Sequence, residues 1–352
     1  METFRVVATG SVTNVGLTAV ETAASVRAGV CLCEESQWRD SRWQPIVFGG
    51  VVDDGLVPLS DAVSNGRMLP TRIARLVRLG ATALAEALSG GKIPRPPLFL
   101  ALPEHGVTQH LEPQGFLNSL ACQTAHSFDL STSSAEFSGR AGGLVALAKA
   151  GERIRRDPAT PVLVGGVDSF DDPLIVDRLE ADGRLKTPSN SDGFIPGEAA
   201  GVLLLASEVA VKKYGLADLA AITPPAVAQE EGHLYSLNTP YRGDGLARAV
   251  TALVATQSPQ PIAEVYSSMN GEHYWAKEWG TTCTRNSAAF APDVRLHHAV
   301  EFFGDIGAAF GPVAISLAVV GLQKGYRRSP ILVYASSDYG QRVATILTIN
   351  NN

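Results

Sequence analysis

The sequence predicts an α/β fold in which helices cover a largely buried sheet. Segments typical of strands and of helices alternate along the whole chain. The expected strands are continuous apolar runs, as at 199–206 (Ala-Ala-Gly-Val-Leu-Leu-Leu-Ala), which is the pattern of a strand covered on both faces. The order of strands and helices is similar in the two halves of the chain, which suggests an internal duplication although the halves share little residue identity.

The composition is that of a globular protein with a sizeable core. The 352 residues are 45% hydrophobic and 18% charged, enough for two average domains or one large α/β unit. The net charge of −6 disfavours nonspecific binding to nucleic acid, because such binding depends on clustered Lys and Arg.

Three features favour a cytoplasmic protein. The first ten residues lack the basic and apolar regions of a signal peptide. The uncharged run 306–322 is interrupted by Gly and Pro, as expected of a buried helix rather than a membrane span. The four cysteines are scattered, and Cys31 and Cys33 are too close along the chain for an ordinary disulfide, which fits a reducing compartment.

The first half of the chain should span residues 1–210. A helix in it should end at Gly29, a residue that suits a C-cap. The expected strands lie at 4–9, 97–103, 160–169 and 199–206, with a further strand beginning near 128, and the expected helices lie at 17–29, 70–91 and 139–156.

The second half should span residues 211–352 and form one compact unit with the first. It repeats the same alternation of strands and helices. The expected strands lie near 217–223 and at 262–268, 330–336 and 342–349, and the expected helices lie at 243–256, near 271–279 and at 303–323.

An unusual stretch leads into the strand at 199–206. It reads Asp-Gly-Phe-Ile-Pro-Gly-Glu-Ala-Ala-Gly over 192–201, so glycines and one carboxylate, Glu198, precede a core strand. Glycines permit close approach of neighbouring backbone and tight packing. We expect this stretch to serve as a closely packed structural lead into the sheet.

Four stretches of the sequence resemble the thiolase-like superfamily, and specifically the β-ketoacyl-acyl-carrier-protein synthases (ketosynthases). They lie at 6–29, 165–185, 192–207 and 302–325, and "DGFIPGEAAGVLLLAS" is the most specific of them. Their order and spacing cover nearly the whole chain, which is shorter than a typical ketosynthase. The resemblance implies a five-layered αβαβα fold with two mixed sheets that arise from an internal duplication.

The resemblance also indicates which residues stand at the family's catalytic positions. Ketosynthases use a cysteine at the N-terminus of a central helix, two histidines and a lysine. The cysteine position falls on Arg140 or, with a shift of two residues, on Ser138. The two histidine positions fall on Asn270 and Asp305, and the lysine position falls on Val300.

The remaining family features are also altered. The resemblance makes Glu198 a buried partner of site residues, and the family's Gly-Phe-Gly-Gly turn is replaced by Ser-Asp-Tyr-Gly-Gln-Arg at 337–342. Ser138 suits the N-cap of the central helix. His273 lies three residues beyond Asn270 and could substitute for the lost histidine. Cys283, in an apparently polar loop, could be an exposed thiol.

These replacements predict a protein without ketosynthase turnover. An arginine carries no free lone pair with which to attack a thioester. Asp305 would repel a malonyl carboxylate, and we expect it to form a buried ion pair with Arg140.

Three hypotheses of function follow. The first is an inactive ketosynthase-like scaffold, adaptor or dimer partner; degenerate thiolase-like proteins of this kind occur beside bacterial type VI secretion genes, which suggests an accessory role in effector loading. The second is a chain-length-factor-like partner of an active ketosynthase in fatty acid or polyketide synthesis. The third is a β-ketoacyl-synthase-type acyltransferase with a replaced nucleophile, such as Ser138 or Cys283.

The expected partners follow from the same resemblance. We predict a homo- or heterodimer with a thiolase-like chain, paired through the strand region 128–137, and secretion effectors or adaptors as further partners. We predict no cofactor, no metal, no nucleic acid and no membrane span, since motifs such as GxxxxGK[ST] and HExxH do not occur in the sequence.

Overall fold

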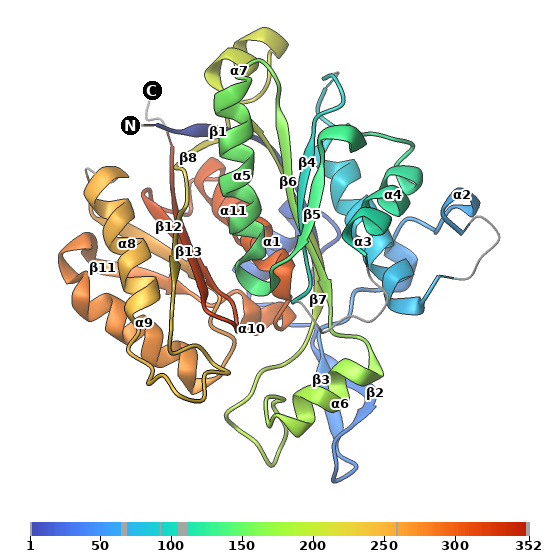
Figure 1. Ribbon diagram of the computed structural model, residues 1–352, viewed down its shortest axis with the longest axis vertical. Coiled ribbons are helices and arrows are strands. Elements are labelled where there is room, and N and C mark those ends of the chain that lie inside the picture. Colours follow the sequence, from blue (N-terminus) through green and yellow to red (C-terminus); the bar gives the residue numbers. More distant parts are fainter. Residues whose placement is uncertain (1, 65–68, 92, 105–111, 258–259, 350–352) are drawn as a thin grey trace.

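The structure is a computed structural model that describes residues 2–64, 69–91, 93–104, 112–257 and 260–349. It consists of five layers (Figure 1). Two central helices lie between two layers of strands, and further helices cover the outer face of each layer of strands. The predicted five-layered α/β fold is therefore confirmed.

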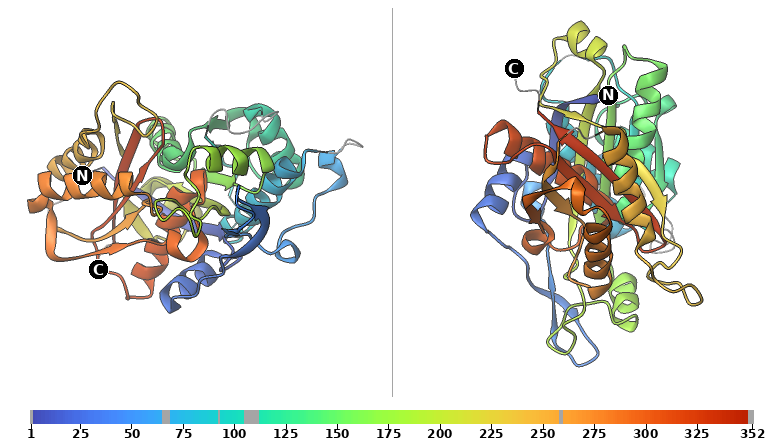
Figure 2. Two further views of the ribbon diagram at one scale, coloured as in Figure 1. Left: turned by 90° about the horizontal axis from the view of Figure 1, so that it is seen from below. Right: turned by 90° about the vertical axis from the view of Figure 1, so that its left-hand side faces the viewer.

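The first half supplies five strands of the main sheet and a separate hairpin. The hairpin, β2 and β3, projects together with α6 from one end of the molecule (Figure 2). The strands of this half are β1 (Phe4–Val12), β2 (Glu34–Arg39), β3 (Pro45–Phe48), β4 (Leu98–Leu102), β5 (Ser134–Phe137), β6 (Val162–Ser169) and β7 (Glu198–Ala206). Its helices are α1 (Ala19–Ala28), α2 (Asp61–Ser64), α3 (Thr71–Ala87), α4 (Pro113–Gln123), α5 (Gly142–Arg156), α6 (Pro173–Ala181) and α7 (Glu208–Tyr214).

The second half contains the remaining strands of the main sheet and four helices. Its strands are β8 (Ala220–Ile222), β9 (Ala226–Gln229), β10 (Ile262–Ser267), β11 (Phe290–His297), β12 (Ile331–Ser336) and β13 (Gln341–Thr348). Its helices are α8 (Asp244–Gln257), α9 (His273–Arg285), α10 (Val300–Phe303) and α11 (Phe310–Gln323).

The strand order shows that the two halves repeat one topology. The first half has the order β1-β7-β6-β4-β5 and the second half β8-β13-β12-β10-β11. In each order the first two pairings are antiparallel and the last two are parallel. The two mixed sheets expected from the resemblance are joined into one eleven-stranded sheet, because the short strand β8 pairs with both β1 and β13.

The two central helices, α5 and α11, occupy corresponding places in the repeated topology. Each follows the outermost strand of its half, β5 or β11, and precedes β6 or β12. Nearly every side chain of α11 is buried, as expected of a helix that is apolar on all sides. The N-terminal ends of both helices lie at the same end of the middle layer, so residues just before Gly142 and Phe310 come close together.

Several boundaries differ from the sequence-based expectation. The helix expected at 303–323 begins only at Phe310, because Gly304 adopts a φ of +77° and ends the preceding helix α10 at Phe303. The strand expected from 128 starts only at Ser134, after a short 3₁₀ turn. Strand β11 was not anticipated. Gly29 caps α1 as predicted, with a φ of +74°. The expected boundary at residue 210 falls within α7.

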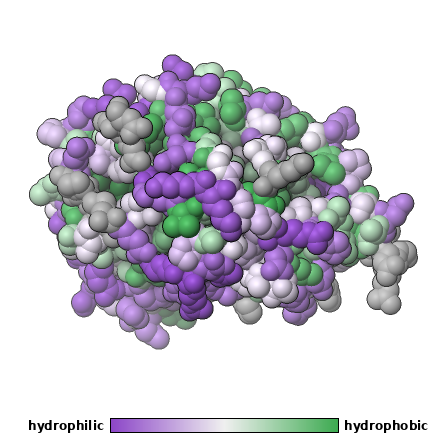
Figure 3. Space-filling model, turned by 90° about the horizontal axis from the view of Figure 1, so that it is seen from above, coloured by the Kyte–Doolittle hydropathy of each residue, from purple (hydrophilic) through white to green (hydrophobic). Residues whose placement is uncertain are grey.

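The end of the molecule that carries α7 is mainly hydrophilic, with separate small apolar patches (Figure 3). Within the ranges given above, no helix is both long and apolar enough to cross a membrane.

Candidate functional site

Arg140 occupies the start of the central helix α5, where the chain makes a 3₁₀ turn at Gly139–Ala141. Its side chain is buried, with 5% exposed. Nε and Nη2 donate to Oδ2 of Asp305 at 3.0 and 2.7 Å. Nη1 donates to the carbonyl oxygen of Ser336 at 3.0 Å and lies 3.3 Å from Oδ1 of Asp338. The guanidinium is thus held by groups from two distant segments of the second half.

Three further residues extend this ion pair into a network. Asn270 donates from Nδ2 to Oδ2 of Asp305 at 2.8 Å and to Oε2 of Glu272 at 3.0 Å. Arg184 binds both oxygens of Glu272 at 2.8 Å and Oδ2 of Asp338 at 2.6 Å. We refer to the six residues of this network as the site cluster. They are Arg140, Arg184, Asn270, Glu272, Asp305 and Asp338.

The backbone around Asp305 explains how its carboxylate reaches the site cluster. Gly304 turns the chain through a positive φ, a conformation that side chains other than glycine rarely adopt. The amide of Asp305 then donates to the carbonyl oxygen of Ile195, and its carbonyl oxygen accepts from Gly197 at 2.9 Å. A Cβ on Gly197 would lie 2.4 Å from the carbonyl oxygen of Phe303. The glycine-lined stretch 192–201 therefore packs directly against the Asp305 turn, as its composition predicted.

Opposite charges offset the effect of burial on the pKa values of two members of the site cluster, Arg140 and Asp338. Burial lowers the pKa of Arg140, but the carboxylates of Asp305 and Asp338 outweigh it and hold that pKa above the ordinary range. Burial raises the pKa of Asp338, but Arg184 and Arg140 bring it below its usual value. The Arg140 guanidinium also lies 4.9 Å from the centre of the Trp275 ring, a distance at which a cation and an aromatic ring attract.

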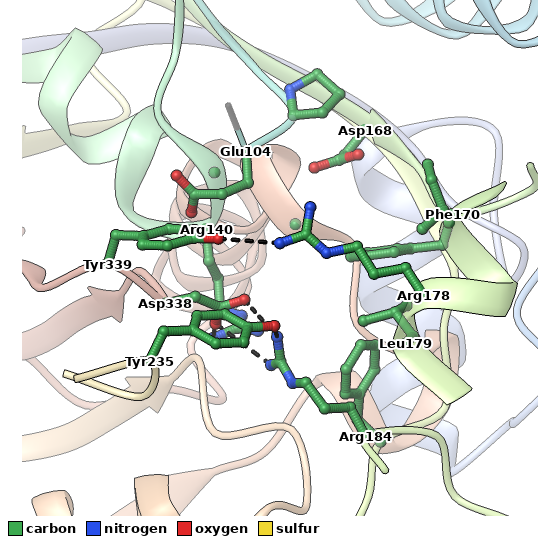
Figure 4. Close-up of a pocket in the computed structure, with 15 residues that line it drawn as sticks. Glu104, Arg140, Asp168, Phe170, Arg178, Leu179, Arg184, Tyr235, Asp338 and Tyr339 are labelled. Carbon is green, nitrogen blue, oxygen red and sulfur yellow. Dashed lines mark hydrogen bonds and ion pairs between the residues drawn. The ribbon is translucent and has the colours of Figure 1, made fainter. Parts of the chain in front are cut away.

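A small cavity of about 40 Å³ lies in front of Arg140 (Figure 4). Aromatic and aliphatic side chains form much of its wall, and Arg178 bridges part of it by donating to the Tyr339 hydroxyl at 3.1 Å. The charged and phenolic residues of the lining are Glu104, Arg140, Asp168, Arg178, Arg184, Tyr235, Asp338 and Tyr339.

A second and larger cavity lies on the other side of the network. It has a volume of about 450 Å³, and Asn270 and Val300 contribute to its wall together with Lys186 and His298. Arg140 lines the first cavity, Asn270 lines the second, and both bind Asp305. The site cluster therefore lies between the two cavities.

The structure brings together three of the six site residues predicted from the sequence. Arg140, Asn270 and Asp305 converge, and the expected ion pair between Arg140 and Asp305 is present. Val300 supplies an apolar side chain to the second cavity. Glu198 belongs to a different network, because its carboxylate accepts from the Val51 amide, the Ser169 hydroxyl and the Arg75 guanidinium.

The expectation that Ser138 caps the central helix is wrong. Among the described residues, its side chain makes no capping hydrogen bond. The hydroxyl of Ser337 takes this place, accepting from the Ala141 amide at 3.0 Å and donating to the Ser138 carbonyl oxygen at 2.8 Å. The cap comes from the other half of the chain, where local sequence could not reveal it.

The two alternative side chains are also placed differently from the expectation. Cys283 lies on helix α9 and not in a loop, and burial raises the pKa of its thiol to about 11. His273 begins the same helix with its side chain 71% exposed, and its Nδ1 lies 2.8 Å from Oδ1 of Asp192. The raised pKa of Cys283 is the opposite of the lowered pKa that activates a nucleophilic thiol. His273 is mostly exposed at the surface.

Sequence reasoning missed Arg184, Glu272 and Asp338 as members of the site cluster. For Asp338 the sequence contained an indication of a place near the site, because the residue lies in the segment 337–342 that replaces a family turn. Arg184 and Glu272 had none, since their segments meet only in the folded chain. Among the described residues, the search for groups of three or more His, Cys, Asp and Glu side chains placed to hold a metal ion finds none.

Comparisons with known proteins agree with this geometry at the level of the fold. Residues 101–210 match the family model of the β-ketoacyl synthase N-terminal domain. These residues include the end of β4 and all of β5, α5, β6 and β7, and so the start of the central helix at Arg140. No curated protein matches the sequence significantly.

Solved structures of ketosynthases match nearly the whole chain. One is a chain of AntDE:AntF, described as a type II polyketide synthase acyl-carrier protein in complex with its ketosynthase; identity is 17%, each chain is covered to 99%, and the TM-score is 0.78. The ishigamide ketosynthase/chain length factor is 15% identical, with 99% of each chain covered and a TM-score of 0.77. The ketosynthase from module 6 of the Bacillus subtilis 168 bacillaene synthase is 12% identical. The match covers 100% of this chain and 73% of that chain, with a TM-score of 0.82. The fold is therefore thiolase-like, of the ketosynthase type.

Proposed function

We propose that this chain is a non-catalytic ketosynthase-like subunit that acts as the dimer partner of, or scaffold for, another thiolase-like chain. The observation that carries the proposal is Arg140 at the start of the central helix, buried and bound to Asp305. The residue at this point of the fold cannot form an acyl-enzyme, since a guanidinium offers no free lone pair.

The electrostatics of the helix terminus support this reading. The N-terminus of a helix carries a partial positive charge, which favours an anion such as a thiolate and disfavours a cation. Arg140 places a full positive charge there, and Asp305, Asp338 and Trp275 compensate it. The arrangement is that of a structural ion pair that links the two halves.

The edge of the sheet supports a role in association. β5 is the terminal strand of its half and pairs only with β4 among the described strands. Such an edge exposes unpaired N–H and C=O groups, which proteins usually cover. Similar structures include a protein described as a ketosynthase/chain length factor, and this likeness supports a chain-length-factor-like role in a pair of thiolase-like chains.

The accessory role in type VI secretion is the more specific form of the scaffold hypothesis, and it stays a prediction. Genes that neighbour the gene for this chain distinguish the two roles. An acyl carrier protein and an active ketosynthase in the neighbourhood favour the chain-length-factor role, and secretion spike and effector genes favour the accessory role.

Light scattering during size-exclusion chromatography tests the association. We expect twice the monomer mass for the chain alone or a one-to-one complex with a thiolase-like chain encoded nearby. The double variant S131K/T132K, in the exposed segment just before β5, should weaken that assembly because it brings like charges into the interface. The matched variant T284K/S287K, at exposed positions at and just beyond the end of α9 in the other half, should not. A strict monomer under both conditions contradicts the proposal.

A further inference from the structure

The second cavity is lined by charged side chains without a partner, unlike those of the site cluster beside it. Lys186 and Glu301 line this cavity and are exposed. Among the described residues, neither side chain takes part in a hydrogen bond or an ion pair. The carboxylate of Glu272, which also lines the cavity, is already engaged by Arg184 and Asn270. The cavity therefore presents one cation and one anion that no described residue neutralises.

Both residues have a fixed backbone and a free side chain. The amide of Lys186, in the segment between α6 and β7, donates to the carbonyl oxygen of Phe194 at 2.9 Å. The amide of Glu301, on α10, donates to the carbonyl oxygen of His298 at 3.1 Å. The two side chains do not form an ion pair with each other. The chain thus holds opposite charges at one cavity without pairing them.

Apolar side chains supply another part of the wall. Ile195, Met269, Ala276 and Val300 line the cavity, and Val300 is only 8% exposed. The volume of about 450 Å³ falls in the range of small-molecule sites. Such sites combine an apolar lining with a few polar groups that fix the orientation of the ligand. The second cavity has both components.

We propose that the second cavity binds a free α-amino acid with a large apolar side chain. The carboxylate of the ligand pairs with Lys186 and its ammonium group with Glu301, while its side chain packs against Ile195, Met269 and Val300. Hydrogen bonds between charged groups are about twice as strong as those between neutral groups. The exposure of Lys186 and Glu301 leaves the entrance open to solvent.

The two charges select a zwitterion over other small ligands. A fatty acid or a phosphate ester would pair with Lys186, but it would bring a negative charge into the same cavity as Glu301, and like charges repel. An amine would meet the same difficulty with Lys186. A neutral apolar ligand would cover both charges without pairing them, which costs free energy. A ligand that carries both charges neutralises both side chains.

The position of the cavity links its ligand to the site cluster. Asn270 and Glu272 line the cavity, and they also bind Asp305 and Arg184. A ligand that binds the folded chain and not the unfolded chain stabilises it by mass action. An amino acid in the second cavity should therefore raise the melting temperature. This effect does not depend on association with another thiolase-like chain.

The test is isothermal titration calorimetry of the full chain with leucine, methionine and phenylalanine, together with thermal unfolding at each ligand concentration. We expect one binding site per chain and a rise in the melting temperature with the amino acid that binds. Two analogues of leucine each lack one charge: 4-methylpentanoate has no amine, and 3-methylbutylamine has no carboxylate. Each should bind at least ~10-fold more weakly than leucine, because each loses a hydrogen bond between charged groups.

Matched variants assign the two charges. K186Q and E301Q should each weaken leucine binding by at least ~10-fold. In K186Q leucine should lose its advantage over 3-methylbutylamine, and in E301Q its advantage over 4-methylpentanoate, which a merely structural role of either residue would not produce. The control K212Q/E152Q removes exposed charges of α7 and α5, and it should bind as the unmodified chain does. Circular dichroism checks that each variant is folded.

Three outcomes overturn the proposal. One is the absence of binding for all three amino acids at millimolar concentration. Another is equal binding of leucine and 4-methylpentanoate, which would mean that the ammonium group is not recognised. The last is leucine binding that K186Q and E301Q leave unchanged, which would place the ligand elsewhere on the chain. None of these outcomes bears on the proposed role in association, which the sizing experiment tests separately.

Discussion

Two buried carboxylates line the same small cavity, Asp338 and Asp168, and their pKa values are shifted in opposite directions. In the site cluster, Asp338 is shared by Arg184 and Arg140, and its pKa lies below the usual value although burial raises it. Asp168 has one arginine, Arg72, at 3.3 Å, and burial raises its pKa to about 6. Two guanidiniums outweigh the cost of burying a carboxylate here, and one does not.

The contrast separates two kinds of buried charge at this cavity. The site cluster is a buried network of ion pairs that links the two halves, whereas Asp168 is a buried carboxylate whose pKa is raised by burial. The site cluster should therefore contribute to the stability of the fold over the whole neutral pH range. The contribution of Asp168 should fall as the pH rises from about 4 to about 6.

Loss of the central carboxylate should have the largest effect. Asp305→Asn keeps the shape of the side chain but leaves Arg140 buried without its main counter-ion, and it should lower the free energy of unfolding by about 3–5 kcal/mol. Urea denaturation followed by circular dichroism measures this. The control Asp53→Asn breaks ion pairs of a carboxylate that is 69% exposed, and it should cost less than about 1 kcal/mol.

The double variant Arg140→Met with Asp305→Leu provides the complementary test. Replacement of a whole buried ion pair by apolar side chains of similar volume is often neutral. The double variant should therefore recover most of the stability that Asp305→Asn loses. A loss below about 1 kcal/mol for Asp305→Asn would show that the site cluster contributes little to the fold.

The pH dependence of Asp168 should have an intermediate effect. Its folded-state pKa of about 6 lies above the ordinary value of 3.8, so between these pH values the folded chain binds a proton that the unfolded chain has lost. Its contribution to stability therefore falls as the pH rises from about 4 to about 6. A shift of this size corresponds to about 3 kcal/mol.

Comparison with Asp168→Asn isolates this contribution. Urea denaturation of both proteins between pH 4.5 and 7.5 should show the stability advantage of the unmodified chain shrinking as the pH rises. An advantage that stays constant or grows over this range would mean that Asp168 does not titrate as proposed.

The smallest effect is expected at the cavity mouth. Arg178 is 44% exposed and donates to the Tyr339 hydroxyl. Exposed contacts of this kind contribute little, so Arg178→Ala should change the unfolding free energy by less than about 1 kcal/mol. The same denaturation experiment measures it. A change as large as that of Asp305→Asn would remove the distinction between exposed and buried charges.

Most of the strands and helices could be predicted from the sequence, because the patterns that indicate them are local or periodic. Apolar runs marked β7 and β12, helical spacing marked α3, and Gly29 marked the end of α1. Strand β11 was not predicted, because its sequence contains charged residues and a proline. That sequence is Phe-Ala-Pro-Asp-Val-Arg-Leu-His. It is an edge strand with a half-exposed surface, and such strands lack the continuous apolar signal of the core.

The site was predictable only in part, and for a related reason. Arg140 and Asp305 could be paired because the resemblance to ketosynthases placed both at the same catalytic centre. Arg184 and Glu272 meet them through folding, and their segments contain no local pattern that predicts a contact. The cap from Ser337 to Ala141 is equally nonlocal. Contacts between the two halves are what the sequence alone did not reveal.

Intact-protein mass spectrometry tests the central claim, the absence of ketosynthase chemistry, most directly. The purified chain is incubated with acyl- and malonyl-loaded carrier proteins, an active ketosynthase serves as the positive control, and carbon dioxide release is followed in parallel. We expect an unchanged mass and no decarboxylation, because the resemblance to ketosynthases places Arg140 and Asp305 at the positions of the nucleophile and a histidine. A stable acyl adduct on Ser138, Cys283 or any other residue of this chain would contradict it.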